Sequence, residues 1–364
     1  MAEGGNVVAI VIPALDPDGS LPAYVKALRE RMPFPILLVD DGSAPVFKAV
    51  FAECVAAAPD VFLLTHEANK GKGRALKTAF ADLLARYPGL LGCVTCDSDG
   101  QHLPDDVVRC AEALRENPRA LVLGCRSFGL EHVPLRSRFG NNAIRALFRL
   151  ATGRRFLDTQ TGLRAIPAAF MERLLDCPGE RFEFESHMLL RLNGFDLVQL
   201  PIETVYINEN RGSHFKPLRD SVRISAIVLG EVLVRFARFV ASSLLSFGVD
   251  CGLFGLLFYR VFQEGAPFRV SLSAGLARAV SMTVNYFCNR YFVFSGGAGR
   301  RSFNRYIALA GAILAASILL TKAALVYIPW AGRHAVAAKA IIDLGLFFAS
   351  FGYQRLVVFG RGAK

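Results

Sequence analysis

The residues of this chain best suited to chemistry are two aspartates, Asp97 and Asp99, separated by one serine. They follow the apolar run 92–96, which we expect to form a buried strand, so both carboxylates should lie where that strand ends. Carboxylates at positions i and i+2 of a bent strand end can share one divalent cation, and such a cation can hold a diphosphate. Asp-x-Asp also occurs in ordinary turns, so the surrounding sequence decides how this spacing is interpreted.

The elements around this motif alternate between strand and helix patterns. We expect strands at 7–12, 36–39, 61–65, 92–96 and 120–124, with helices at 21–31, 46–58, 71–87 and 104–117 between them. This order predicts a doubly wound, mostly parallel α/β sheet. Ligands should bind at its strand ends, near Pro13, Asp40 and Asp97. The sequence has neither a GxGxxG fingerprint nor a Walker loop, which argues against dinucleotide and P-loop ligands.

The second part of the chain is much more apolar than the first. Hydrophobic residues make up 53% of the sequence, and the excess is concentrated beyond Phe239. Four apolar blocks approach the roughly 20 residues that a membrane-spanning helix needs. We expect these spans at about 239–262, 270–292, 306–328 and 336–359. The sequence thus predicts an all-α transmembrane domain of four helices after the α/β domain.

Basic residues predict how these spans are oriented. Arginines precede the first block, occupy the connector between the second and third, and follow the fourth, which places these segments in the cytoplasm by the positive-inside tendency. Arg269 and Arg333 lie in the short outer turns and weaken this signal. We therefore expect a multi-pass integral membrane protein whose α/β domain is cytoplasmic.

Two further patterns concern the membrane part. Residues 217–238 place most of their charged side chains on one arc of a helix, which favours an interfacial amphipathic helix between a first domain at 1–216 and a membrane domain at 239–364. Asn289-Arg290 closes the second span and Gln354-Arg355 closes the fourth, so two related helical hairpins are expected.

Charged residues inside the spans should pair, because a lone charge at that depth is costly. We expect Asp250 to pair with Arg278 and Lys322 with Asp343.

Charge and cysteine content narrow the class of partner. The formal net charge of +11 suits nucleic acid, anionic lipid headgroups or phosphorylated substrates. Zinc-finger spacing and basic helices interleaved with aromatics are missing from the sequence, so we expect lipid and phosphate rather than nucleic acid. The eight cysteines are scattered singly except for Cys93 and Cys96, which favours buried structural thiols in a reducing compartment over a redox pair.

Read together, the motifs form an ordered series that resembles a known family. In chain order the motifs are Pro13, Asp40-Asp41-Gly42-Ser43, Asp97-Ser98-Asp99-Gly100-Gln101-His102, Arg126, residues 158–164 and Arg181-Phe182-Glu183-Phe184-Glu185. The series resembles the inverting family 2 glycosyltransferases of GT-A fold, a Rossmann-like α/β class, and is closest to their polyprenyl-phosphate (dolichyl-phosphate mannose synthase-like) branch. The remainder resembles the GtrA-type membrane domain that is often fused to such enzymes, with Arg278, Asn285-Tyr286 and Asn289-Arg290 as its marks.

The resemblance implies roles for the residues at the strand ends. Pro13 and Asp40 would contact the base and ribose of a sugar nucleotide, and Asp97 would lie near the ribose or diphosphate. Asp97, Asp99 and Gln101 would hold Mg²⁺ or Mn²⁺. Lys72 lies between two glycines, where it could contact the diphosphate or belong to a solvated loop. The nucleotide could be UDP or GDP.

The acceptor implied by the resemblance is a polyprenyl phosphate, either dolichyl or undecaprenyl. Its phosphate is already an anion, so it needs cations that position it rather than a general base. We expect Arg126, Arg136, Arg211 and Lys216 to serve in this way. Arg211 is the first choice, because it precedes the interfacial helix and would meet the lipid at headgroup height. Glu183 and Glu185 are expected to position neighbouring arginines.

The predicted activity is therefore the inverting transfer of a hexose to polyprenyl phosphate at the cytoplasmic face of a cell-envelope membrane. The alternative is a translocator or scaffold for lipid-linked sugars whose soluble domain binds a sugar nucleotide without turnover, and the ionisable residues inside the spans keep it open. A processive polysaccharide synthase is poorly supported, because the only tryptophan, Trp330, lies in a predicted outer turn. Homo-oligomerisation through the membrane domain remains open.

Overall fold

The computed structural model describes residues 7–126, 135–203, 217–262, 268–294 and 300–360. The side chains of residues 135–142, 217–221, 269, 271, 300, 318, 332, 335, 336 and 339 are outside that description. The chain divides into two compact units. The first contains Met1–Ala146 and Phe156–Val228, and the second contains Leu147–Arg155 and Leu229–Lys364. Two of the three boundaries fall inside helices, α5 (Leu135–Thr152) and α8 (Pro217–Leu256), and the third lies in the segment that follows α5.

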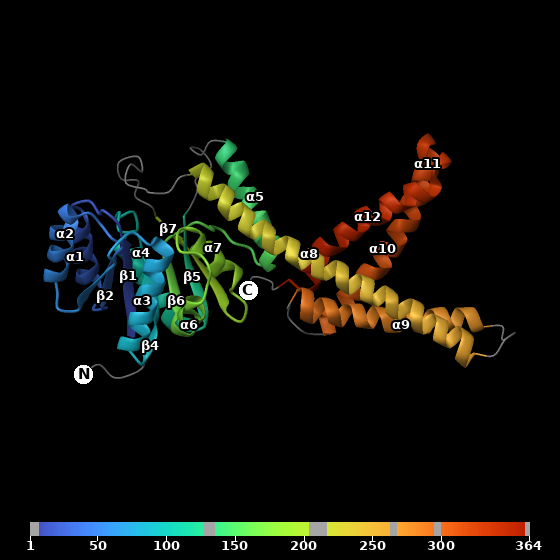
Figure 1. Ribbon diagram of the computed structural model, residues 1–364, viewed down its shortest axis with the longest axis horizontal. Helices are drawn as coiled ribbons and strands as arrows, with labels where there is room; N and C mark the ends of the chain where they lie inside the picture. Colours follow the sequence, from blue (N-terminus) through green and yellow to red (C-terminus); the bar gives the residue numbers. More distant parts are fainter. Residues whose placement is uncertain (1–6, 127–134, 204–216, 263–267, 295–299, 361–364) are drawn as a thin grey trace. The chain divides into compact units, whose positions relative to one another are not determined.

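The first unit is built on a seven-stranded sheet with the order β3-β2-β1-β4-β6-β5-β7 (Figure 1). Its strands are β1 (Val7–Ala14), β2 (Ile36–Asp40), β3 (Val61–Thr65), β4 (Leu90–Thr95), β5 (Ala120–Arg126), β6 (Arg164–Pro167) and β7 (Asp196–Ile202). All neighbouring strands run parallel except β6, which is antiparallel to β4 and β5. The predicted mostly parallel α/β sheet is confirmed.

Helices connect most of these strands. They are α1 (Leu21–Arg31), α2 (Lys48–Ala56), α3 (Lys72–Arg86), α4 (Pro104–Glu116), α5 (Leu135–Thr152), α6 (Ala168–Leu175) and α7 (Glu183–Leu190), with a 3-10 turn at Pro45–Phe47. In β2 all five residues are buried, and β1 is buried from its second residue onward, as expected for central strands covered on both faces. Parallel pairing sets the ends of the central strands at one edge, with Ala14 opposite Asp40 and Val11 opposite Thr95.

The second unit consists of long helices, together with the last residues of α5. Its helices are the part of α8 (Pro217–Leu256) from Leu229 onward, α9 (Arg269–Cys288), α10 (Arg300–Tyr327), α11 (Pro329–Arg333) and α12 (Ala335–Tyr353). Three π-helical turns follow α8, α9 and α12: η3 (Leu257–Val261), η4 (Asn289–Val293) and η5 (Gln354–Val358). Among the described residues, Arg301–Tyr327 and Ala340–Val358 are long and apolar enough to cross a bilayer. The predicted number of four spans is not confirmed by this criterion and stays a prediction.

The predicted interfacial helix over 217–238 has no separate boundary in the structure. Residues on both sides of position 238 belong to the single helix α8, because nothing in the sequence there breaks a helix. Whether its first half lies in a membrane interface stays a prediction.

The two predicted hairpin-closing motifs adopt the same local conformation and meet each other. Asn289 begins η4 and Gln354 begins η5, and the Asn289 side-chain amide donates to Gln354 Oε1 at 3.0 Å. Both residues are buried, and Ser242 donates to Asn289 Oδ1 at 2.8 Å. Polar side chains at corresponding positions thus satisfy each other inside an apolar unit.

The predicted pair of Asp250 and Arg278 is confirmed, with 3.3 Å between Arg278 Nη2 and Asp250 Oδ2. Ser281 also donates to Asp250 Oδ1 at 3.0 Å. In the second hairpin Asp343 accepts a hydrogen bond from Ser317 at 2.6 Å, and its predicted pairing with Lys322 stays a prediction.

Candidate active site

A cavity of about 340 Å³ opens where the central strands of the first unit end. Twelve residues line it: Pro13, Ala14, Leu15, Asp41, Asn69, Gly71, Lys72, Asp97, Ser98, Asp99, Arg181 and Phe182. They come from the ends of β1, β2 and β4, the first turn of α3 and the segment before α7. This edge is where open α/β sheets bind ligands.

Asp41 fixes one wall of the cavity. Its carboxylate is buried and accepts hydrogen bonds from the backbone amides of Lys70 (3.0 Å) and Gly71 (2.8 Å). His66 Nδ1 lies 2.8 Å from the same carboxylate. Gly71 precedes α3 with φ +101°, a conformation that side-chain-bearing residues rarely adopt. Asp41 thereby holds the loop that delivers Lys72 to the cavity.

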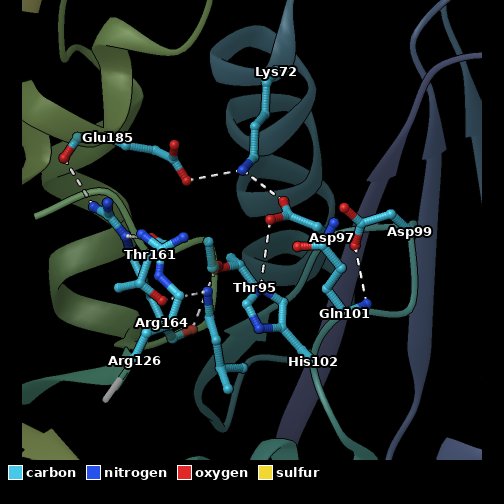
Figure 2. Close-up of polar contacts among 12 residues, drawn as sticks. Lys72, Thr95, Asp97, Asp99, Gln101, His102, Arg126, Thr161, Arg164 and Glu185 are labelled. Carbon is cyan, nitrogen blue, oxygen red and sulfur yellow. Dashed lines mark hydrogen bonds and ion pairs between the residues drawn. The ribbon is translucent and has the colours of Figure 1, made fainter. Parts of the chain in front are cut away.

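Lys72 bridges two carboxylates across the cavity (Figure 2). Its Nζ lies 2.7 Å from Asp97 Oδ1 and 3.0 Å from Glu185 Oε1. Burial alone would lower the pKa of Lys72, but the charges of Asp97 and Glu185 outweigh it and raise that pKa above its usual range. Lys72 therefore stays a cation at the cavity wall.

Asp97 is held in place from several sides. Burial alone would raise its pKa, but Lys72 and His102 more than reverse that effect and hold the pKa well below its usual range. His102 Nε2 lies 3.4 Å from Asp97 Oδ2. Gly162 lies against the same carboxylate, since a Cβ at Gly162 would fall 2.3 Å from Asp97 Oδ2. The carboxylate is ionised, and its position leaves no space for a larger residue at 162.

Asp99 has the opposite electrostatic environment. Burial and then the charge of Asp97 raise the pKa of Asp99. Its Oδ1 accepts a hydrogen bond from the Gln101 backbone amide at 3.1 Å, and Oδ2 has no partner within the described part of the chain. Two neighbouring carboxylates that repel each other are relieved by a shared cation, so this donor set fits a divalent metal.

The protein offers few ligands for such a metal. Among the described residues, no three His, Cys, Asp or Glu side chains are grouped so as to hold an ion. A pair of aspartates with a glutamine fits Mg²⁺ or Mn²⁺ that takes its remaining ligands from water and a diphosphate.

A buried arginine, Arg164, connects two segments that lie next to the site. Arg164 is 1% exposed, and it donates from Nε to the Thr161 carbonyl at 2.9 Å and from Nη1 to the Glu185 carbonyl at 2.8 Å (Figure 2). It thus ties the segment that carries Gly162 to the start of α7, which carries Glu185.

The segment 180–185 is docked on the first turns of α3. A Cβ at Gly73 would fall 2.6 Å from Phe184 Cβ, and the Arg74 amide donates to the Glu180 carbonyl at 3.0 Å. Glu180 pairs with Arg74 at 2.6 Å and with Lys77 at 3.0 Å. Glycines at 71 and 73 permit this approach and so place the 180–185 segment beside Lys72.

The predicted site residues divide into three groups. The structure brings Pro13, Lys72, Asp97 and Asp99 together around the cavity. Three others are described but do not line it: Asp40 accepts a hydrogen bond from the Ser43 amide at 2.8 Å, Gln101 follows Asp99, and Arg126 pairs with Asp158 at 2.7 Å. Arg211, Lys216 and the side chain of Arg136 lie outside the described residues.

Sequence reasoning assigned no role to three polar residues that line the cavity, and it gave Glu185 a different partner. Asp41, Asn69 and Arg181 line the cavity, and Glu185 reaches Lys72. Glu185 was expected to position an arginine and instead positions a lysine, whereas Glu183 does pair with an arginine, Arg223, at 3.0 Å. Two sequence features could have indicated these residues: the pair of aspartates at the end of β2 and the charged motif 181–185.

Comparison with known proteins now identifies both parts of the chain. Residues 9–175 match the family model of glycosyl transferase family 2, and residues 238–359 match that of the GtrA/DPMS transmembrane domain. The chain therefore carries a glycosyl transferase family 2 domain followed by a GtrA/DPMS transmembrane domain, which confirms the resemblance inferred from the motifs. Together with the long apolar helices, the second match indicates a membrane protein.

Two relatives are named for the transfer of sugars to dolichyl phosphate or to a polyprenol. A UDP-N-acetylglucosamine–dolichyl-phosphate N-acetylglucosaminyltransferase of Methanococcus voltae is 27% identical, covering 55% of this chain and 86% of the relative. A polyprenol monophosphomannose synthase of Mycolicibacterium smegmatis is 28% identical, covering 53% of this chain and 75% of the relative. Glucosyl-3-phosphoglycerate synthase from Mycobacterium tuberculosis, solved with Mn²⁺ and UDP, is 18% identical, with a TM-score of 0.43 over 63% of this chain and 80% of that chain.

Proposed function

We propose that this protein transfers a hexose from a nucleoside-diphosphate sugar to a membrane polyprenyl phosphate, with inversion, at the cytoplasmic face. The observation that carries the proposal is the cavity in which Asp97, Asp99 and Lys72 meet at the strand ends. Relatives named for transfer to dolichyl phosphate and polyprenol support the acceptor class. A UDP-sugar and a GDP-sugar both remain candidate donors.

The reaction joins an oxygen of the acceptor phosphate to C1 of the sugar and breaks the bond between C1 and the β-phosphate oxygen. The bonding electron pair leaves with the nucleoside diphosphate, so negative charge grows there as the sugar departs. The attacking oxygen is already anionic, so no general base is required. Displacement from the face opposite the leaving group inverts the configuration at C1.

The residues of the chain bind and position the reactants. A divalent cation bound by Asp97, Asp99 and Gln101 would supply positive charge to the departing diphosphate. Lys72 can exchange its contact with Asp97 or Glu185 for a phosphate oxygen, and Pro13 and Asp40 are proposed to contact the nucleoside. Arg211, with Arg126, Arg136 and Lys216, is proposed to bind the acceptor phosphate.

The alternative of a non-catalytic translocator or scaffold has less support. Two of the buried polar residues of the helical unit, Asn289 and Gln354, bond to each other. The carboxylates at the cavity are those that a transferase needs.

The test is mass spectrometry of lipids from membranes that contain the protein, after incubation with a panel of UDP- and GDP-sugars. One donor should give a new polyprenyl-phosphate hexose, and membranes that contain Asp99→Asn should not. If none of these donors gives a new lipid and the carrier is present, the transferase proposal is wrong.

A separate variant tests the acceptor assignment. Arg211→Ala should abolish formation of the lipid product while sugar-nucleotide binding by calorimetry stays near normal. Arg211→Lys should restore only part of the activity, because a point charge does not replace a bidentate guanidinium. Loss of nucleotide binding in Arg211→Ala would assign Arg211 to the donor phosphates instead.

A further inference from the structure

Arg181 lines the cavity beside Lys72 without being taken up by the ion pairs around it. Each acidic residue near it in sequence already has another cation. Glu180 pairs with Arg74 and Lys77, Glu183 with Arg223, and Glu185 with Lys72. Within the described residues, Arg181 has no carboxylate within ion-pairing distance. Its charge therefore remains available to a ligand.

The stem of Arg181 is fixed by the packing of its backbone segment. A Cβ at Gly71 would fall 2.6 Å from Arg181 Cγ and 2.4 Å from the Glu180 carbonyl oxygen. The Arg74 amide donates to that carbonyl at 3.0 Å, which holds the segment to α3. The absence of a side chain at Gly71 lets the Arg181 stem lie against the turn that presents Lys72. Both cations thus come from one packed substructure.

The charges around the cavity indicate what Arg181 would bind. A divalent cation between Asp97 and Asp99 would be matched by their two carboxylates. Lys72 contacts Glu185 as well as Asp97, so Glu185 offsets its charge even when Asp97 turns to a metal. The charge of Arg181 has no such counterpart. A diphosphate that enters the cavity brings anionic oxygens. Among the described residues that line the cavity, Arg181 is the cation that can meet these oxygens without competition from a carboxylate.

We propose that Arg181 binds the diphosphate of the donor and stabilises the charge that grows on it as the sugar leaves. This inference rests on the proposed function, because it assumes a nucleoside diphosphate in the cavity. The planar guanidinium suits two phosphate oxygens at once, which lysine cannot reproduce. Arg181 is therefore a donor-binding residue in addition to those selected from the sequence.

The experiment is calorimetric titration of the full chain in detergent, with Mn²⁺, by a nucleoside diphosphate and by the corresponding monophosphate. UDP with UMP and GDP with GMP are both used. In Arg181→Ala the diphosphate should bind about 10- to 100-fold more weakly, the loss expected for a charge-assisted hydrogen bond. The monophosphate should bind within about twofold of wild type, because it lacks the second phosphate. Arg181→Lys should recover part of the loss.

Arg191→Ala is the matched control, since Arg191 is an exposed arginine of the same domain that does not line the cavity. It should bind both nucleotides as wild type does. Thermal melting shows that each variant is folded, and Arg181→Gln replaces Arg181→Ala if the latter is not.

Three results would overturn the inference. If the Arg181→Ala variant binds the diphosphate as tightly as the wild-type protein does, Arg181 does not contact the diphosphate. Equal weakening of the monophosphate and the diphosphate indicates a general effect on the cavity. If the Arg181→Ala variant binds nucleotides normally but has a raised KM for polyprenyl phosphate in the transfer assay, Arg181 binds the acceptor instead. If wild-type protein binds none of the nucleotides, the proposed function fails together with this inference.

Discussion

At the residue scale, the central feature is a pair of carboxylates with opposed environments. Lys72 and His102 stabilise the charge of Asp97, whereas Asp99 carries a charge that burial and Asp97 both disfavour. Asp99 is thus the carboxylate that gains most from a bound cation. This asymmetry makes Asp99 the more informative position for testing metal dependence.

We predict that chelation abolishes sugar transfer and that Mg²⁺ or Mn²⁺ restores it. Asp99→Ala should lower the rate by more than about a hundredfold, the scale of losing one key electrostatic group. The measurement is the initial rate of lipid product formation against free metal concentration. Asp105→Ala is the control, because Asp105 is an exposed aspartate of α4 that pairs with Arg31. Full activity in excess chelator would rule out the metal.

The cysteines near the site are predicted to be unreactive. Burial raises the pKa of Cys96 and of Cys110 to about 12, and that of Cys125 to about 11. Because the thiolate is the reactive form, these thiols stay protonated and inert at pH 8. Mass spectrometry after maleimide treatment should find buried Cys93 and Cys96 unlabelled until the chain is unfolded. Rapid labelling of Cys93 and Cys96 in the folded protein would instead support the interpretation that they form a redox pair.

Sequence reasoning located the two aspartates at the end of β4 but not all of the cavity wall. Asp97 and Asp99 were predictable because an unbroken apolar run ends immediately before them. The choice between Asp40 and Asp41 was not, because adjacent side chains at a strand end point in different directions. Arg181 reaches the cavity only through the packing of Glu180 and Phe184 on Gly71 and Gly73. Contacts between segments so far apart leave no local pattern.

At the element scale, the strands that sequence revealed are the continuous apolar ones. β1, β2 and β4 are almost wholly buried, so their composition identifies them. β6 is buried but has only four residues, begins with Arg164 and ends in Pro167, whereas most of β7 is half-buried. Neither strand therefore appears in the sequence as a long apolar run. The antiparallel β6 also departs from the regular strand–helix order, which periodicity alone could not anticipate.

The pair of Asp250 and Arg278 gives a prediction about α8 and α9. The Arg278 side chain is 69% exposed on the protein surface, where it would face lipid. A lone charge in that environment costs about 2.5–3.5 kcal/mol on insertion scales, so breaking the pair should reduce membrane expression. Combining Asp250→Arg with Arg278→Asp should restore the expression lost in either single variant, measured by fluorescence size-exclusion chromatography.

A mismatched double variant controls for general tolerance of swapped charges. Arg278→Asp combined with Asp343→Arg should not recover expression, because Asp343 accepts from Ser317 in the other hairpin. Equal recovery by the matched and mismatched pairs would show that the 3.3 Å contact does not stabilise the protein.

At the scale of the whole molecule, the amino-acid composition predicted an α/β domain followed by an apolar membrane domain. The family matches at 9–175 and 238–359 agree with that division. The structural division lies within helices instead, since α5 contributes its last residues to the second unit. Arg355 of η5 shows why: it is buried and donates from Nε to the Leu150 carbonyl at 3.0 Å. Such a contact joins residues about two hundred positions apart and is invisible in sequence.

The predicted orientation of the chain in the membrane depends on the positions of its basic residues. Arg300, Arg301 and Arg305 occupy the connector before the third predicted span, and Arg361 and Lys364 occupy the tail. The positive-inside tendency predicts that both segments lie in the cytoplasm, on the side of the proposed donor site. With four spans, the connectors around residues 265 and 331 lie outside. Green fluorescent protein fused after Lys364 should therefore fluoresce, while alkaline phosphatase at that position should be inactive.

The same reporters test the number of spans. Alkaline phosphatase fused after Gly265 or Ala331 should be active, and after Ala298 inactive, because each span reverses the side of the membrane. Replacing Arg300, Arg301 and Arg305 with glutamate should weaken this pattern, since the basic connector is then lost. If only the helices over Arg301–Tyr327 and Ala340–Val358 cross the bilayer, the Gly265 and Ala298 fusions will report the same side. That outcome would contradict four spans and would leave the cytoplasmic donor site to be tested by the Lys364 fusions alone.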